Sequence, residues 1–209
     1  MPLARILLVE DEPFVRSMLS VALAALSIDV VANCANAREA VAAVQGHDIE
    51  VAVLDLDLGP GPTGIDVAYA LREIQRTIGI VFLTSFSDPR ILEPQGRALP
   101  RGSRFLVKSA LGSPDLLRDA IVEARNDPLK DTRHSLSNAG LTTNQIDVLR
   151  LLSLGRSNAE IAQEMGVGEK AVERTISRII EVLQIDRSSG NARIQLARRY
   201  LEMSGKALP

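Results

Sequence analysis

Five short apolar runs, separated by stretches with helical periodicity, occupy the first 125 residues of the 209-residue chain. They lie at residues 6–9, 30–32, 51–54, 80–83 and 105–107. Runs of this length and apolar content predict strands that are buried on both faces. Strands that alternate with helices form a doubly wound parallel sheet, whose ligands bind at the carboxyl ends of the strands. We therefore predict an α/β domain with a five-stranded parallel sheet, and functional residues directly after the apolar runs.

Polar residues with the spacing of helix caps precede three of the helical stretches. Asn36 is followed by Glu39, Thr63 by Asp66, and Ser113 by a proline. The segment 87–100 differs, because three prolines and a glycine leave room for only one short helix.

The second part of the chain has no strand pattern. Residues 126–138 mix Asp, Asn, Ser and Pro without apolar periodicity, and they predict a linker. From residue 141 the pattern is helical, with capping-box spacing at Thr142 and Gln145 and again at Ser157 and Glu160. We predict an α/β domain at 1–125, a linker at 126–138 and a small all-helical domain at 139–209.

The composition excludes several classes of protein. Hydrophobic residues make up 46% of the chain and charged residues 24%, which is typical of a globular protein. No apolar stretch approaches about 18 residues and acids interrupt the N-terminal apolar run, so we expect a cytoplasmic protein without a membrane span. A single cysteine, Cys34, excludes an internal disulfide. Two Tyr, four Phe and no Trp are too few to stack single-stranded bases.

Carboxylates follow the first and third apolar runs. Glu10 and Asp11 come directly after the first run, and Asp55 and Asp57 follow the third. Because neighbouring parallel strands end at one edge of a sheet, at least three carboxylates should meet there. Oxygen ligands without His or Cys indicate a hard divalent cation, and Mg²⁺ is the expected cofactor.

A hydroxyl and an ammonium follow the last two runs. Thr84 ends the fourth run and Lys108 follows the fifth. Together with a carboxylate nucleophile and a metal ion, these donors would complete a phosphoryl-binding site. Each acid alone could instead cap a strand or a helix, but the ordered set of five positions favours the phosphoryl site.

The segments LLVEDEP, VLDLDLG, VFLTS and FLVK resemble the receiver domain of two-component response regulators, a flavodoxin-like fold, over about residues 3–125. The resemblance implies that Asp55 is the phospho-acceptor. It also implies that Glu10, Asp11, Asp55 and the backbone carbonyl of Asp57 hold Mg²⁺.

The same resemblance assigns a switch. Thr84 and Lys108 would contact the phosphoryl group. The added charge and acceptor oxygens would draw Thr84 inward, and Phe105 would move into the space that Thr84 leaves. Three departures stand out: the loop after Asp55 is one residue longer than the common pattern, Ser109 replaces a frequent proline, and the segment 87–100 is irregular.

The pair Asp55-x-Asp57 also resembles the nucleophile and acid pair of haloacid-dehalogenase-type phosphatases. In that family the pair follows the first strand, whereas here it follows the third run and leaves Glu10 and Asp11 without a role. A phosphatase is therefore a distant alternative.

Residues 141–187 have the layout of a helix-turn-helix unit. One helix ends at Gly155, a second begins at Ser157, and a third is predicted over about 169–183 after a glycine turn. Its apolar residues share one face, opposite a polar and basic stripe that suits a recognition helix in the DNA major groove. An ordinary helical bundle can also carry such a solvated face. The stripe comprises Lys170, Arg174, Ser177 and Arg178.

The sequence LTTNQIDVLRLLSLGRSNAEIAQEMGV closely resembles the effector domain of the NarL/LuxR class over about 60 residues, and the motif G-x-S-N-x-E-I-A at 155–162 carries the match. The resemblance implies contacts to double-stranded promoter DNA by the stripe, with Arg156 and Ser157 as candidate backbone contacts. Glu173 and Thr175 stand where Lys and His are common, so relatives do not predict the preferred DNA site.

The last helical stretch, 191–203, has an apolar face that contains Leu196 and Tyr200. It could pack against the small core, or it could form a homodimer, which the resemblance implies for the DNA-bound state.

The net charge of −2 at first argues against a DNA partner. Up to residue 125 the chain has 12 basic and 16 acidic residues, a net −4, whereas the remainder has 12 and 10, a net +2. The acidic excess lies in the predicted metal-binding domain. We therefore expect few phosphate contacts per protomer and a dependence on dimerisation.

The sequence predicts a response regulator, not an enzyme, in which a cognate histidine kinase phosphorylates Asp55 and the helical domain binds promoter DNA. The runner-up is a DNA-binding or partner-binding regulator with the same fold but no phosphorylation switch. The longer loop and the irregular segment favour it weakly.

Overall fold

The computed structural model describes residues 2–92, 96–130, 140–186 and 190–205. The chain divides into two compact units. The first unit comprises 1–85 and 97–134, and the second comprises 86–96 and 135–209. The segment 86–96 therefore groups with the second unit, although its neighbours along the chain belong to the first.

The first unit is built on a parallel sheet of five strands in the order β2-β1-β3-β4-β5. The strands are β1 (Arg5–Val9), β2 (Asp29–Cys34), β3 (Val51–Leu54), β4 (Gly79–Thr84) and β5 (Arg104–Val107). This order confirms the doubly wound sheet that the sequence predicts. Because Val9 pairs with Leu54, the next residues, Glu10 and Asp55, leave the sheet at the same level.

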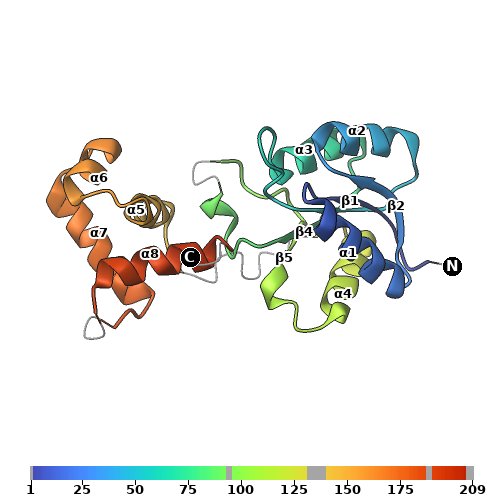
Figure 1. Cartoon of the computed structure of the whole chain (residues 1–209). Coiled ribbons are helices and arrows are strands. Elements are labelled where there is room, and N and C mark those ends of the chain that lie inside the picture. Colours follow the sequence, from blue (N-terminus) through green and yellow to red (C-terminus); the bar gives the residue numbers. More distant parts are fainter. Residues whose placement is uncertain (1, 93–95, 131–139, 187–189, 206–209) are drawn as a thin grey trace. The chain divides into compact units, whose positions relative to one another are not determined.

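Helices cover both faces of the sheet (Figure 1). α1 (Pro13–Ala25) and α4 (Pro114–Asn126) lie on one face, and α2 (Ala37–Gly46) and α3 (Gly64–Ile74) lie on the other. The predicted caps of α2, α3 and α4 are confirmed, because each accepts a hydrogen bond from a backbone N–H in the first helical turn. These caps are Asn36, Thr63 and Ser113.

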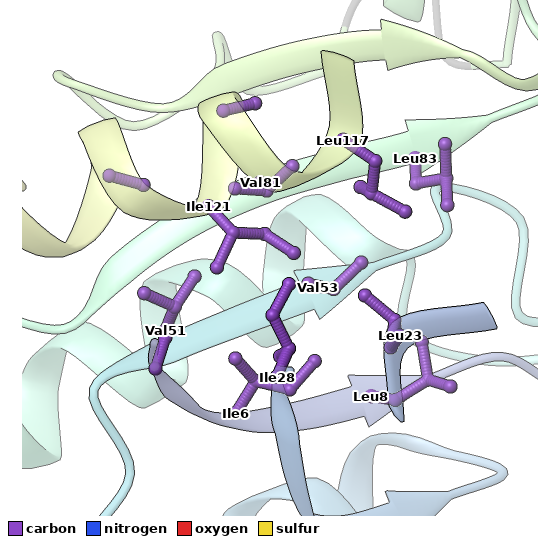
Figure 2. Close-up of a cluster of buried hydrophobic side chains, with 13 residues drawn as sticks. Ile6, Leu8, Leu23, Ile28, Val51, Val53, Val81, Leu83, Leu117 and Ile121 are labelled. Atoms are coloured by element: carbon purple, nitrogen blue, oxygen red, sulfur yellow. The ribbon is translucent and has the colours of Figure 1, made fainter. Parts of the chain in front are cut away.

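Buried aliphatic side chains fill the space between the sheet and the pair α1 and α4 (Figure 2). Alternate residues of the central strands face this layer, as the pleat requires, and fully burying each contributes about 1.5–3 kcal/mol. The layer fixes the register of the strand ends that carry the polar residues. Its labelled members are Ile6, Leu8, Leu23, Ile28, Val51, Val53, Val81, Leu83, Leu117 and Ile121.

The two outer strands are less buried than predicted. In β2 three of the six residues are half-buried and two are exposed, and in β5 three of the four are half-buried, whereas β3 and β4 are buried throughout. The prediction that all five strands are buried is therefore wrong for β2 and β5. The reason is their position, since an edge strand has a neighbouring strand on one side only.

The second unit is helical. It contains α5 (Thr143–Ser153), α6 (Asn158–Met165), α7 (Glu169–Val182) and α8 (Ala192–Met203). Both predicted capping boxes are confirmed at the starts of α5 and α6. Gly166 ends α6 in the left-handed region, with φ of 66°, so the chain turns sharply into α7. The helix-turn-helix layout is confirmed, α8 packs against α5, and Leu196 of α8 is fully buried.

The segment between β4 and β5 contains one 3-10 turn, η1 (Pro89–Ile91), in its described residues. This agrees with the prediction of a single short helix. The Ser87 N–H donates to the carbonyl of Met203 at 2.9 Å, and the Tyr200 hydroxyl lies 3.5 Å from the Ile91 carbonyl. Tyr200 and Met203 belong to α8 of the second unit, and η1 also packs against α5 of the same unit. These contacts explain why the segment 86–96 groups with the second unit.

Residues 131–138 of the predicted linker lie outside the described residues. Its first residue, Asn126, is the last residue of α4. Arg72 donates to the carbonyl of Pro128 at 2.8 Å, so the chain just after α4 still packs on the first unit. No helix in the described part of the chain is long and apolar enough to cross a membrane.

Candidate functional site

Lys108 joins the ends of two strands. Its Nζ lies 2.6 Å from Oδ2 of Asp55 and 2.7 Å from Oε2 of Glu10. Asp55 is 8% exposed and Glu10 is 3% exposed, so both carboxylates are nearly out of contact with water. The structure thus brings together an acid from the end of β1, an acid from the end of β3 and the lysine that follows β5.

The backbone after Asp55 holds the carboxylate of this residue in place. The Leu56 N–H donates to Oδ1 of Asp55 at 2.6 Å, and the Asp57 N–H lies 3.4 Å from the same oxygen. Gly64, the first residue of α3, packs on this backbone, because an added Cβ would lie 1.9 Å from the Asp55 carbonyl oxygen. A side chain at position 64 would therefore force this backbone or α3 to move.

Burial and the facing charges shift the pKa of Glu10 and that of Lys108. Burial raises the pKa of Glu10 above its ordinary value of 4.5, and the hydrogen bond from Lys108, which lowers it, does not offset this effect. Burial lowers the pKa of Lys108, but the charges and hydrogen bonds of Asp55 and Glu10 raise it more, so it lies above 10.5. Two carboxylates face one ammonium, and the site retains an excess of negative charge.

Asp11 and Asp57 stand outside this cluster. Both are exposed, and Oδ1 of Asp57 accepts from the Gly59 N–H at 3.2 Å. Across the described residues, no three Asp, Glu, His or Cys side chains gather closely enough to hold one ion. Two carboxylates meet at the sheet edge rather than the three expected, with the lysine ammonium between them.

The donor chemistry at this edge fits Mg²⁺. This ion binds through one or two carboxylates and keeps several waters, so it does not require a cage of protein ligands. Glu10 supplies a buried carboxylate oxygen there, Asp11 an exposed one, and Asp57 a backbone carbonyl in the adjoining loop.

Arg16 is a site residue that the sequence pattern did not single out. Its guanidinium donates to the backbone carbonyl of Glu10 and, at 3.3 Å, to that of Asp11. It is the fourth residue of α1, where the helix dipole favours acids over bases. A basic residue in the first turn of a helix is therefore the sequence signal that could have indicated a role for Arg16 at this site.

The two predicted switch residues lie on adjacent strands. Thr84 is the last residue of β4 and is completely buried. It pairs in the sheet with Val107, so Lys108 follows one position beyond it. Phe105 lies on β5, is half-buried and pairs with Phe82 of β4.

A second polar surface lies on α7. Val172, Ile179 and Ile180 on this helix are buried. The side chains of Lys170, Arg174 and Arg178 are exposed, and Ser177 is half-buried. The predicted apolar and basic faces are therefore separated as the helical period requires.

The remaining two candidate DNA contacts, Arg156 and Ser157, lie at the start of α6. The Ser157 hydroxyl donates to Oε2 of Glu160 at 2.8 Å, and Arg156 lies 3.6 Å from Oε1 of that glutamate. Both residues are exposed. Arg193 of α8 donates to the Arg156 carbonyl, so the entry to α6 is fixed from α8.

Comparison with known proteins gives two family matches. Residues 6–110 match the model of the response regulator receiver domain, and residues 139–193 match that of bacterial regulatory proteins of the luxR family. The chain is 30% identical to the DNA-binding transcriptional activator DevR/DosR of Mycobacterium tuberculosis, covering 88% of this chain and 90% of the relative. It is 29% identical to the transcriptional regulatory protein DesR of Bacillus subtilis, and this alignment covers 76% of this chain and 78% of the relative.

A solved structure supports the fold of the whole chain. RcsB from Salmonella enterica serovar Typhimurium, bound to promoter rprA with the phosphomimetic BeF3⁻, aligns with a TM-score of 0.54 and 20% identity. The alignment covers 94% of this chain and 98% of that chain.

Proposed function

The chain belongs to the two-component response regulators that join a receiver domain to a LuxR-type helix-turn-helix domain, and on this premise we propose that Asp55 is its phospho-acceptor. Members of this family are DNA-binding transcription regulators rather than enzymes, so the phosphatase alternative is set aside. The observation that carries the proposal is the contact of Lys108 with both Asp55 and Glu10.

The chemistry is the capture of a phosphoryl group. A carboxylate oxygen of Asp55 attacks the phosphorus of a phosphohistidine on a histidine kinase, the P–N bond breaks as an acyl phosphate forms, and the histidine leaves with a proton. The Lys108 ammonium is placed to pair with the incoming phosphoryl oxygens, since it already contacts the acceptor carboxylate. Thr84, one register position before it on β4, is the proposed hydroxyl donor.

Mg²⁺, held by Glu10, Asp11, the Asp55 carboxylate and the Asp57 carbonyl, would neutralise charge between the acids and the phosphoryl oxygens. Phe105 is the proposed aromatic switch. Because it lies half-buried on the edge strand next to Thr84's strand, its ring has room to change position when Thr84 moves.

Mass spectrometry tests the proposed phosphorylation of Asp55. Full-length protein incubated with acetyl phosphate and Mg²⁺ should gain the mass of one phosphoryl group, and Asp55→Asn should gain none. Asp119→Asn is the matched control, because Asp119 is an exposed acid on α4, and it should label like the wild type. An unlabelled wild type, or a labelled Asp55→Asn, contradicts the proposal.

For the second unit we propose that the protein binds DNA as a homodimer. In each protomer α7 would be the recognition helix that enters the major groove. The support is the exposed basic face of α7 beside its buried apolar face. The structure of RcsB, which has a similar fold, contains RcsB bound to promoter DNA. The proposed DNA contacts are Lys170, Arg174, Ser177 and Arg178, with Arg156 and Ser157 at the backbone.

A beryllofluoride adduct separates this function from the phosphorylation-independent alternative. With beryllofluoride and Mg²⁺, the protein should form more dimer and bind promoter DNA more tightly, and Asp55→Asn should show neither change. If the adduct forms but dimerisation and DNA affinity stay unchanged, the regulator works without the switch.

A further inference from the structure

Glu173 borders the basic stripe of α7. At 100° per residue it lies about 40° around the helix from Ser177 and about 60° from Lys170. Its side chain is exposed. It is the fifth residue of α7, in the N-terminal half of the helix, where the residues of a recognition helix contact base edges.

The carboxylate of Glu173 has no partner among the described residues, unlike several other acids of this unit. Glu160 pairs with Arg156, Glu164 lies 4.0 Å from Arg150, and Glu202 pairs with arginines of α8. The shortest of these contacts is 3.1 Å. Within the described residues the charge of Glu173 is therefore not balanced by an ion pair.

An unpaired carboxylate near DNA is repelled by the phosphates unless a base donates a hydrogen bond to it. In the major groove the donors are the N4 amino group of cytosine and the N6 amino group of adenine. Adenine also presents its N7 acceptor beside that donor, which repels the second carboxylate oxygen, whereas cytosine itself presents no acceptor there. Cytosine is therefore the base that a glutamate reads best.

We propose that Glu173 accepts a hydrogen bond from a cytosine amino group and so specifies cytosine at one position of each DNA half-site. This inference rests on the proposed entry of α7 into the major groove. It assigns to an acidic side chain the role of rejecting wrong sequences, beside the attraction to DNA that Lys170, Arg174 and Arg178 supply.

The test is a binding-site selection from randomised duplexes with the full-length protein in its beryllofluoride form. Wild-type sites should contain a cytosine at one fixed position per half-site, and replacing it should weaken binding by about 5- to 150-fold. Glu173→Ala should lose the preference at that position alone. Glu173→Gln should move the preference toward adenine, because glutamine pairs bidentately with adenine N6 and N7.

Glu181→Gln is the matched control. Glu181 is an exposed acid in the last turn of the same helix, so its neutralisation should raise affinity for all duplexes alike without changing the selected sequence. If Glu173→Ala selects the same sites as the wild type, the inference is wrong although DNA binding stands. If the wild type enriches no sequence at all, the proposed DNA function fails together with it.

Discussion

Nζ of Lys108 lies 2.6 Å from Oδ2 of Asp55, although 53 residues separate them in the chain. Lys108 follows the edge strand β5 and Asp55 follows β3, with β4 between them. Two strand spacings are about 9–10 Å, so a long, flexible side chain is needed to cross the end of β4. This geometry explains why an ammonium on four methylenes occupies position 108.

Replacing Lys108 with Met should destabilise the first unit by about 1–3 kcal/mol at neutral pH, because Glu10 and Asp55 would lose their shared partner. Urea unfolding measures the change. Lys130→Met is the control, since that lysine is 68% exposed, and it should change the free energy of unfolding by less than about 0.5 kcal/mol.

The destabilisation should also depend on pH. The pKa of Lys108 in the folded protein is raised above 10.5. Its contribution is therefore fully present below the pKa of the unfolded chain and is lost as the pH rises through the folded-state pKa. The stability difference between wild type and Lys108→Met should shrink above pH 10.5; a constant difference would show that the ion pairs are not its source.

Gly64→Ala should disturb the acceptor loop. The new methyl group would lie 1.9 Å from the Asp55 carbonyl oxygen, so the loop or α3 must move, at a cost of about 1–3 kcal/mol. Labelling by acetyl phosphate should slow as well, because the same backbone orients the carboxylate. Gly46→Ala is the control, since its new methyl group meets nothing within 4 Å, and both stability and labelling rate should be retained.

Cys34 should react slowly in the folded protein. Burial raises the pKa of its thiol to about 11, whereas a free cysteine has a pKa of about 8.5. At about pH 8 the thiolate fraction, and with it the rate of iodoacetamide alkylation, should be about 200-fold lower than in urea. Ser17→Cys on the exposed side of α1 should react fast in both conditions. Equal rates at the two cysteines would show that Cys34 is accessible.

Ile91→Ala should destabilise the second unit rather than the first. Ile91 is 3% exposed in η1, which packs against α5. Truncating a buried isoleucine to alanine costs about 2–5 kcal/mol, less where the site can collapse. Hydrogen exchange should show faster opening of α5 and α8, with the sheet unchanged. Ile194→Ala, at a position of α8 that is 67% exposed, should leave both units unaffected.

The sequence alone determined the parallel sheet and the helix starts. Each apolar run is a local pattern, and each cap at Asn36, Thr63 or Ser113 needs only neighbours two or three positions away. The polar residues at the strand ends were predictable for the same reason, since parallel strands necessarily end at one edge. The two family resemblances agree with the matches to known proteins.

Only the tertiary structure decided which of these residues meet. Strand order placed β2 and β5 at the edges and left them half-buried, and no local pattern encodes that order. Arg16 reached the carbonyl of Glu10, and the segment after Thr84 joined α5 and α8 through contacts between residues more than 100 positions apart. Periodicity reports what a residue buries within its own element, whereas long-range pairing depends on how all elements pack at once.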